Sequence, residues 1–239
     1  MIAGWVDSYR VNHSWEVLFL RLPAFAHCTQ SLSDVYYLRW MCWRSLAVVK
    51  FNPMKLAPMP WVEGYVLDYH TISSTPTGDP YYRFDTKRTD LGELLFRFKY
   101  RSAGTAALND IVDTVEQFVR GWKPPIECIV PAPASVTRRA QPGTELARGL
   151  AARLLLPVFE GAVAKVKATA QMKNIDDWVE RQRLLAEAIQ VGKDDVRGKC
   201  ILLVDDLIES GSTLRRAAEV LLKDAGARAV YALVLTRTK

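Results

Sequence analysis

Residues Cys200 to Ala225 read CILLVDDLIESGSTLRRAAEVLLKDA, and this stretch decides the fold. The wholly apolar run from Ile201 to Val204 is typical of a strand that is buried on both faces of a parallel sheet. From Leu214 onward, apolar residues recur at the spacing of one helical face, which predicts a helix. The stretch is therefore predicted to form a strand, a loop and a helix, with the loop at the carboxyl end of the strand.

The predicted loop combines an anion site with two carboxylates. Ser212 or Thr213 can cap the start of the helix, and Gly226 can end it. Backbone N–H groups at a helix start, together with neighbouring hydroxyls, bind anions such as phosphate. Asp205 and Asp206 would repel a phosphate, so we expect them to face hydroxyls or a metal ion beside it. A ribose 5-phosphate satisfies both requirements.

The segment VDDLIESGST resembles the 5-phosphoribosyl-1-pyrophosphate (PRPP) signature of type I phosphoribosyltransferases, a strand followed by two acidic residues and a Thr/Ser-Gly-x-Thr loop. The resemblance implies an α/β fold, with a doubly wound parallel sheet, flanking helices and a small hood or hairpin region. It implies that Asp205 and Asp206 hold the ribose hydroxyls and contact Mg²⁺ indirectly. The residues implied to bind the 5-phosphate are Ser210, Gly211, Ser212 and Thr213.

Two other interpretations fit parts of the segment. The small-residue turn can merely join a strand to a helix in a doubly wound domain, and paired carboxylates also occur in receiver domains that bind magnesium. Neither accounts for the run of hydroxyls. A Walker A loop is excluded, because five residues separate Gly192 from Gly198 where four are needed, and Lys199 is followed by Cys200 instead of Ser or Thr.

More distant segments extend the resemblance to the ComF-like group, phosphoribosyltransferase-like proteins linked to DNA uptake or use. It spans roughly residues 91–239. The positions that match by kind and order are Lys99-Tyr100, Pro131-Ala132-Pro133, Arg138, Gly143, Gln171 and Arg181. The amino-terminal cysteine ribbon of that group is absent from this sequence. Pro142, Thr144 and Glu145 stand where that group carries Arg, Phe and Asn, which puts this part of a pyrophosphate or partner surface in doubt.

Pyrophosphate is expected to meet cationic residues that lie far apart in the sequence. A Pro-rich loop after a predicted strand carries a pair of arginines, and guanidinium groups suit phosphate oxygens. The residues assigned to pyrophosphate are Ser135, Arg138, Arg139 and Lys99. A polar segment further along the chain is expected to be a mobile loop that closes over the ligand. The residues assigned to it are Lys165, Lys167, Gln171 and Arg181.

If the protein is an enzyme, the resemblance implies that a nitrogen nucleophile displaces pyrophosphate from C1 of PRPP, with Mg²⁺ as cofactor. Glu209 is the candidate to accept a proton from the nucleophile. Its alternative is a solvent-exposed loop carboxylate. The rival function is a non-catalytic sensor of PRPP or a nucleotide that acts in DNA uptake through DNA or a competence-machinery partner.

The chain is predicted to have three regions. Residues 1–53 are rich in tryptophan and lack clean periodicity; they are either a partner-binding or lid segment, or an extension that is not translated if the native start is Met54. Residues 54–90 form a hairpin or hood, with strands around a turn at 73–80. Residues 91–239 form the phosphoribosyltransferase-like domain.

Within these regions, the remaining elements are predicted from periodicity and from proline and glycine positions. Asp90 is expected to cap the first helix. Helices are predicted at 91–101, 105–119, 144–155 and 178–190. Strands are predicted at 126–130 and 229–235, a strand or hairpin at 157–167, and a polar loop at 168–177.

Composition bounds the class of protein. The 239 residues are 49% apolar and 24% charged, as in ordinary soluble globular proteins. A net charge of +6 is compatible with an anionic ligand or nucleic acid, and equally with a basic surface that has no special partner. The four cysteines are too widely spaced to indicate a zinc ribbon or a disulfide framework. No apolar run suggests a membrane span or signal peptide, so a cytoplasmic protein is expected, and a homodimer is compatible with the sequence.

Overall fold

The computed structural model describes residues 49–57, 59–79, 83–101, 104–134, 141–166, 184 and 187–239. All of them lie within the unit Leu46–Lys239. The expectations for most of the region 1–53, for the arginine pair at 138–139 and for the polar loop at 168–177 fall outside the described residues.

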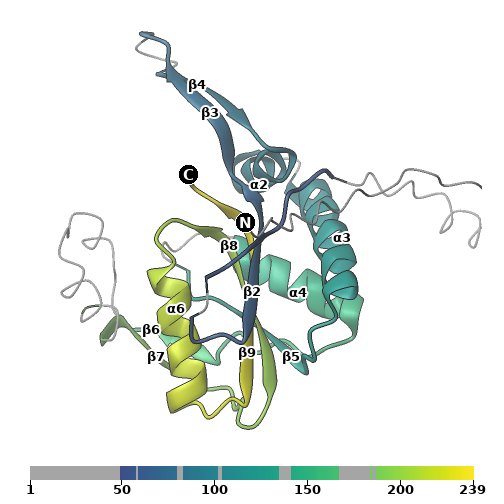
Figure 1. Cartoon of the computed structure of the whole chain (residues 1–239), viewed down its shortest axis with the longest axis vertical. Helices are drawn as coiled ribbons and strands as arrows, with labels where there is room; N and C mark the ends of the chain where they lie inside the picture. Colours follow the sequence, from purple (N-terminus) through teal and green to yellow (C-terminus); the bar gives the residue numbers. More distant parts are fainter. Residues whose placement is uncertain are drawn as a thin grey trace, which may run out of the picture. The chain divides into compact units, whose positions relative to one another are not determined.

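The centre of the described unit is a five-stranded sheet with the order β1-β2-β9-β8-β5. Strand β1 pairs with β2 in the antiparallel sense, and the other neighbouring strands are parallel. The predicted α/β fold with a mostly parallel sheet and flanking helices is therefore confirmed (Figure 1). The strands are β1 (Met54–Lys55), β2 (Glu63–Tyr69), β5 (Cys128–Pro131), β8 (Cys200–Ile208) and β9 (Ala229–Arg237).

Strand β8 is longer than its apolar run suggested. The strand continues past Val204 to Ile208, so Asp205 and Asp206 are strand residues and the connecting loop is only 209–211. The cause is the pairing with β9, in which Asp205 lies beside Val234 and Leu207 beside Thr236. The placement of the 229–235 strand beside β8 is confirmed, with an extension to Arg237.

Three helices cover one face of the sheet: α2 (Asp90–Tyr100), α3 (Gly104–Trp122) and α4 (Pro142–Leu154) (Figure 1). Their apolar stripes pack on side chains that alternate along β8 and β9, such as Leu202, Val204 and Leu233. In α3, for example, Ile111 and Val115 are buried on the face turned toward the sheet. The predicted helices at 91–101, 105–119 and 144–155 are thus confirmed within a few residues.

The opposite face is covered by α6 (Ser212–Glu219), which continues into a π-helical turn, η2 (Val220–Asp224), and by a two-stranded hairpin of β6 (Val163–Lys165) and β7 (Ile189–Val191). Gly226 follows the helix with φ of 69°, and the N–H of Ala227 donates to the carbonyl oxygen of Leu221 at 2.9 Å. The predicted role of Gly226 as the helix end is confirmed, because only glycine enters this left-handed conformation without strain.

The hairpin predicted before residue 90 is formed by other strands than expected. Residues 63–69 belong to the central sheet as β2, and the hairpin consists of β3 (Thr71–Pro76) and β4 (Phe84–Arg88). The first half of the turn predicted at 73–80, residues 73–76, is therefore strand. Strand β3 was not predicted because its sequence is polar and lacks an apolar alternation: both its faces are largely exposed. Its pairing with β4 includes a hydroxyl contact of 3.0 Å between Ser74 and Thr86.

The helix predicted at 178–190 is wrong at its carboxyl end. Ile189–Val191 is strand β7, which pairs with β6 in the antiparallel sense and buries Ile189 completely. The tertiary contact with β6 overrides the helical spacing of the sequence. For 157–167 the strand alternative is confirmed by β6, whose partner β7 lies outside that range.

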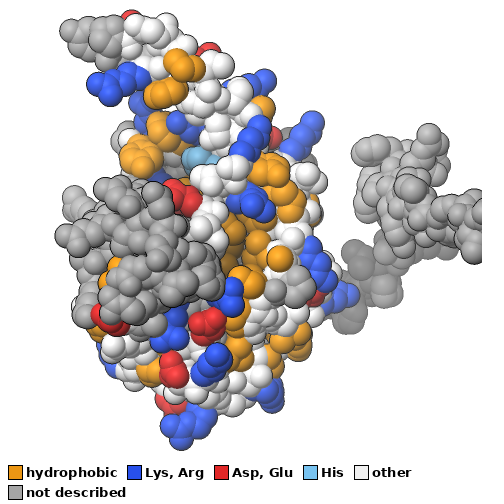
Figure 2. Space-filling model, turned by 60° about the vertical axis from the view of Figure 1, so that its left-hand side comes forward, with side chains coloured by type: hydrophobic (Ala, Val, Ile, Leu, Met, Phe, Trp, Pro, Cys, Tyr) orange, Lys and Arg blue, Asp and Glu red, His pale blue; other side chains and the backbone are white. Residues whose placement is uncertain are grey.

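No helix among the described residues is long and apolar enough to cross a membrane. On the face in Figure 2, Lys and Arg side chains are spread over the protein and its projecting hairpin, with Asp and Glu among them. On that face the described Lys and Arg side chains are therefore not gathered into one basic patch.

Candidate functional site

The carboxyl ends of β5 and β8 open into a cleft of about 390 Å³, a volume in the usual range for small-molecule sites. Such ends are where open parallel sheets bind ligands. The described residues that line it come from α2, the β5 end, the start of α4, the β8 end and the start of α6. They are Lys99, Tyr100, Ala132, Pro133, Ala134, Gln141, Pro142, Gly143, Thr144 and the run from Asp205 to Leu214.

The acidic pair, Asp205 and Asp206, lines this cleft. The backbone N–H of Asp206 donates to Oδ1 of Asp205 at 2.8 Å, which fixes the Asp205 carboxylate. Burial raises the pKa of Asp205 well above its usual range, and the neighbouring charge of Asp206 raises it further. Both residues line the same cleft, and Asp205 is partly withdrawn from water there.

Lys99 reaches the acidic pair from the last turn of α2. Its Nζ forms an ion pair with Oδ2 of Asp206, and the two side chains are only 11% and 18% exposed. The sequence placed Lys99 near pyrophosphate, whereas the structure places its ammonium on the carboxylate implied to hold the ribose. Its role toward pyrophosphate stays a prediction.

The start of α2 is fastened to the end of β2, and this fixes where Lys99 lies. The cap residue is Thr89 and not the predicted Asp90: Oγ1 of Thr89 accepts from the N–H of Gly92 at 3.0 Å and donates to the carbonyl oxygen of Tyr69 at 2.6 Å. A Cβ on Gly92 would stand 2.1 Å from the carbonyl oxygen of His70, so only glycine permits this approach. The helix is thereby held against the strand end beside the cleft.

His70 is a residue near the site that sequence reasoning missed. It follows β2, its Nδ1 lies 3.3 Å from Oγ1 of Thr236, and the same hydroxyl donates to the carbonyl oxygen of Asp206 at 3.3 Å. Burial lowers the pKa of His70, and the positive charge of Lys99 lowers it further. Its position after a parallel strand is a signal that the sequence could have supplied, had β2 been placed in the main sheet.

The loop predicted between the strand and the helix is present, and its helix cap differs from the predicted one. Gly211, with φ of 74°, is the residue before α6, and neither Ser212 nor Thr213 caps the helix with its side chain. The first helical bond runs from the N–H of Arg215 to the carbonyl oxygen of Gly211 at 2.9 Å. The N–H groups that precede it in α6 need partners from outside the helix, which is the condition for an anion site.

The loop has open space at Gly211. Oγ of Ser210 donates to Oγ of Ser212 at 3.0 Å, and apart from these two neighbours no described residue comes within 4 Å of the position where a Cβ on Gly211 would stand. Glu209 and Ser210 are exposed, while Thr213 is half-buried. The predicted loop residues therefore share one cleft with Asp205 and Asp206.

The first turn of α4 also lies close to the acidic pair, at Gly143. A Cβ on Gly143 would lie 3.8 Å from Oδ1 of Asp206 and 3.9 Å from Oδ1 of Asp205. The positive end of a helix dipole stabilises carboxylates at this distance. Gly143 thus helps to build the site, although its neighbours Pro142 and Thr144 depart from the ComF-like pattern.

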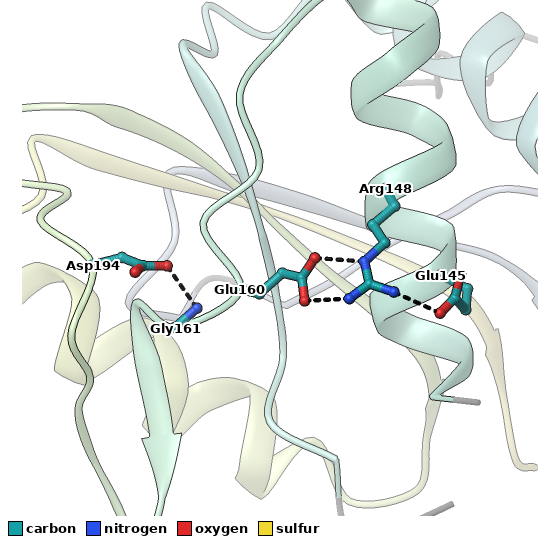
Figure 3. Close-up of polar contacts among 5 residues, drawn as sticks. All are labelled: Glu145, Arg148, Glu160, Gly161 and Asp194. Carbon is teal, nitrogen blue, oxygen red and sulfur yellow. Dashed lines mark hydrogen bonds and ion pairs between the residues drawn. The ribbon is translucent and has the colours of Figure 1, made fainter. Parts of the chain in front are cut away.

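A charged cluster ties α4 to the chain that precedes β6 (Figure 3). Arg148 on α4 donates from Nε and Nη2 to the two carboxylate oxygens of Glu160, at 2.5 and 2.7 Å, and from Nη1 to Glu145 at 2.8 Å. The next residue, Gly161, donates its N–H to Asp194 at 2.7 Å. The bidentate geometry fixes the direction of the guanidinium as well as its distance. These contacts hold α4, whose first turn faces the acidic pair.

Several predicted site residues are not placed by the structure. Lys165 lies in β6 and is not among the described residues that line the cleft; burial lowers its pKa. The predicted site residues outside the described part of the chain are Ser135, Arg138, Arg139, Lys167, Gln171 and Arg181.

The carboxylates of the cleft suit Mg²⁺ only when other oxygens, from water or a bound phosphate, complete its coordination. No group of three His, Cys, Asp or Glu side chains suited to a metal ion occurs among the described residues. Mg²⁺ is commonly bound by one or two carboxylates together with water and phosphate oxygens of the substrate, and Asp205 and Asp206 can supply the carboxylates. They would hold the ion together with its ligand, rather than as a closed protein cage.

Residues 140–239, somewhat less than half of the chain, match the family model of the phosphoribosyl transferase domain. A ribose-phosphate pyrophosphokinase from Thermococcus kodakarensis is 35% identical over 81 residues, 33% of this chain and 29% of that protein. One from Pasteurella multocida is 40% identical over 76 residues, 30% of this chain and 24% of that protein. The chain thus spans less than a third of these curated relatives.

Solved structures resemble the chain distantly. A glutamine PRPP amidotransferase from B. subtilis, complexed with ADP and GMP, aligns with 64% of this chain and 34% of its own, at 17% identity and a TM-score of 0.41. A hypoxanthine phosphoribosyltransferase from Staphylococcus aureus aligns with 54% of this chain and 62% of its own, at 13% identity and a TM-score of 0.34.

Proposed function

We propose that the protein binds PRPP, or a nucleotide with a ribose 5-phosphate, and transfers the phosphoribosyl group to a nitrogen nucleophile. One observation carries the proposal: the acidic pair at the end of β8 and the Gly211 loop at the start of α6 line the same cleft. The first offers carboxylate acceptors to a diol and the second offers N–H donors to a phosphate. The match of residues 140–239 to the phosphoribosyl transferase domain supports it.

The ligand is proposed to lie along the carboxyl end of β8. Asp205 and Asp206 accept hydrogen bonds from the ribose hydroxyls, while the N–H groups at the start of α6 and the hydroxyls of Ser210, Ser212 and Thr213 hold the 5-phosphate. The open space beside Gly211 lets a phosphate approach the backbone closely. The sugar is thereby fixed at both ends, and its C1 is left for the reaction.

The reaction proposed is substitution at C1 of the ribose. The nitrogen lone pair forms the new bond to C1, the bond from C1 to the pyrophosphate oxygen breaks, and pyrophosphate leaves with that electron pair. Charge on C1 resembles an oxocarbenium ion in the transition state. Mg²⁺, when bound, would draw off charge from the leaving pyrophosphate. Glu209, exposed beside the loop, is the proposed acceptor for the proton that the nitrogen loses.

Other predicted residues complete this proposal. Pyrophosphate is assigned to Ser135, Arg138 and Arg139, on the segment that follows β5. The residues assigned to close over the ligand are Lys165, Lys167, Gln171 and Arg181.

The second candidate is a ComF-like sensor that binds the same ligand without turnover and acts in DNA uptake through DNA or a protein partner. The exposure of Glu209 favours it, because Glu209 lines the cleft but is open to water, whereas active sites that exclude water strengthen the interactions of their catalytic groups. The two candidates predict the same affinity for PRPP and differ only in whether a reaction takes place after binding.

Turnover separates the two candidates. The protein would be incubated with PRPP, Mg²⁺ and a panel of nucleobases and amines, with release of pyrophosphate as the readout and PRPP binding measured separately by calorimetry. Release that depends on one acceptor supports the transferase, and binding without release supports the sensor. Absence of both binding and release would contradict both candidates.

A further inference from the structure

Lys99 and Asp206 form an ion pair inside the cleft, with no more than about a fifth of either side chain exposed. Such a pair differs from a surface salt bridge, because water screens it less and each partner leaves an unpaired charge if the other is removed. The acidic pair therefore already has a cationic partner that belongs to the protein.

The neighbouring basic groups do not supply the same charge. His70 has its pKa lowered by burial and by Lys99, so its ring is neutral near pH 7. The guanidinium of Arg88 lies 3.8 Å from the centre of the Phe96 ring and 3.6 Å from Glu93. Among the described residues, Lys99 is thus the cation that an ion pair joins to the acidic pair.

Lys99 is also held in place by its helix. The capping contacts of Thr89 fasten the start of α2 to β2, and the buried side chains of Leu91 and Leu95 pack the helix on the sheet. A tethered ammonium loses little freedom when it meets a carboxylate. A free Mg²⁺ ion must instead shed tightly bound water to reach the same oxygen.

We propose that Lys99 is a built-in counter-cation that competes with divalent metal ions for Asp206. While the ammonium is on Oδ2, a metal ion cannot use that oxygen, and the free protein binds metal weakly at the acidic pair. The divalent ion then binds together with the pyrophosphate of the ligand and not to the free protein beforehand. This order of binding rests on the proposed function, whereas the competition between Lys99 and metal ions for Asp206 does not.

The test measures binding of Mn²⁺ alone, by calorimetry and by the loss of the free-ion electron paramagnetic resonance signal, at about pH 8, where ordinary carboxyl groups are ionised. Four proteins are compared: the wild type, Lys99→Met, Lys99→Arg and Lys55→Met. Lys55 is the matched control, because it also pairs with a glutamate, Glu63, at 2.7 Å, but does not line the cleft.

We expect Lys99→Met to bind Mn²⁺ at least about tenfold more tightly than the wild type, the scale on which one close charge changes a carboxylate. Lys99→Arg, which keeps the charge, and Lys55→Met should match the wild type. Adding Asp206→Asn to Lys99→Met should abolish the gain. Equal Mn²⁺ affinity in the wild type and Lys99→Met, or a gain that survives Asp206→Asn, would overturn the proposal.

Two further controls separate an effect on Mn²⁺ binding from a loss of folding and from a failure of the proposed function. Lys99→Gln repeats the test with a polar side chain, and thermal unfolding of each variant shows that the fold is retained. Because no PRPP is present, failure of the wild type to bind PRPP would contradict the proposed function and leave the Mn²⁺ result standing.

Discussion

Gly143, in the first turn of α4, lies so close to Asp206 that a Cβ there would stand 3.8 Å from Oδ1. That distance is an ordinary van der Waals contact, so an alanine fits without a clash. The added methyl group would, however, cover the side of the acidic pair that faces the cleft.

Gly143→Ala is therefore expected to leave the free energy of unfolding unchanged or raise it by up to about 1 kcal/mol, since alanine favours a helix. Affinity for PRPP should fall about tenfold, the effect of losing one hydrogen bond. Gly149→Ala on the same helix is the matched contrast, because its Cβ would stand 2.6 Å from Cγ2 of Val112. It should destabilise the protein by roughly 1–3 kcal/mol. Equal effects of both substitutions on unfolding would contradict this packing.

The loop before α6 depends on the left-handed conformation of Gly211, with φ of 74°. Gly211→Val should cost about 1–2 kcal/mol of stability, because a β-branched side chain is strained there. Gly211→Asn should cost less, since asparagine tolerates this region. Urea unfolding of the two variants measures the difference. A valine variant as stable as the asparagine variant would show that the loop adopts another conformation.

The Asp205 carboxylate is predicted to destabilise the folded protein at neutral pH while it contributes to PRPP binding. Its pKa is raised in the folded protein, so keeping it ionised at neutral pH costs folding free energy, and this cost disappears as the pH falls toward 3.8. Asp205→Asn should therefore raise Tm at pH 7 and weaken PRPP binding roughly 10- to 100-fold, through loss of a charge-assisted hydrogen bond. A Tm gain that persists unchanged at low pH would contradict the electrostatic explanation.

His70 should make stability depend on pH in the opposite sense. Its pKa is lowered from 6.5 in the folded protein, so the unfolded chain takes up a proton first and stability is lost as the pH falls below 6.5. In His70→Gln this loss should be smaller, while His13 and His27 are present in both proteins and cancel in the comparison. The measurement is the free energy of urea unfolding between about pH 7 and pH 5. Parallel pH profiles would contradict burial of a neutral His70.

The order of elements around the site could be predicted from sequence because the signals there are local. The apolar run from Ile201 and the spacing after Leu214 identified a strand and a helix, and the hydroxyl-rich loop between them predicted an anion site. The strand end was misplaced, because β8 continues through Asp205 by pairing with β9. The sequence of a single strand does not show which other strand it pairs with, so it does not show where the pairing ends.

The contacts between elements that shape the cleft could not be predicted from the sequence for a related reason. Lys99 was recognised as a candidate, but its ion pair with Asp206 depends on how α2 docks on β2. His70 was missed because residues 63–69 were assigned to a hairpin and not to the main sheet. Such contacts join segments far apart in the sequence, and no local pattern specifies them.

The central claim is that Asp205, Asp206 and the Gly211 loop hold a ribose 5-phosphate ligand. Calorimetric titration of PRPP with Mg²⁺ into the wild type and into Asp205→Asn/Asp206→Asn tests it most directly. Asp110→Asn, at an exposed position of α3, is the control. We predict that the double variant weakens binding at least about 100-fold and that the control does not change it. Wild-type affinity in the double variant would contradict the claim.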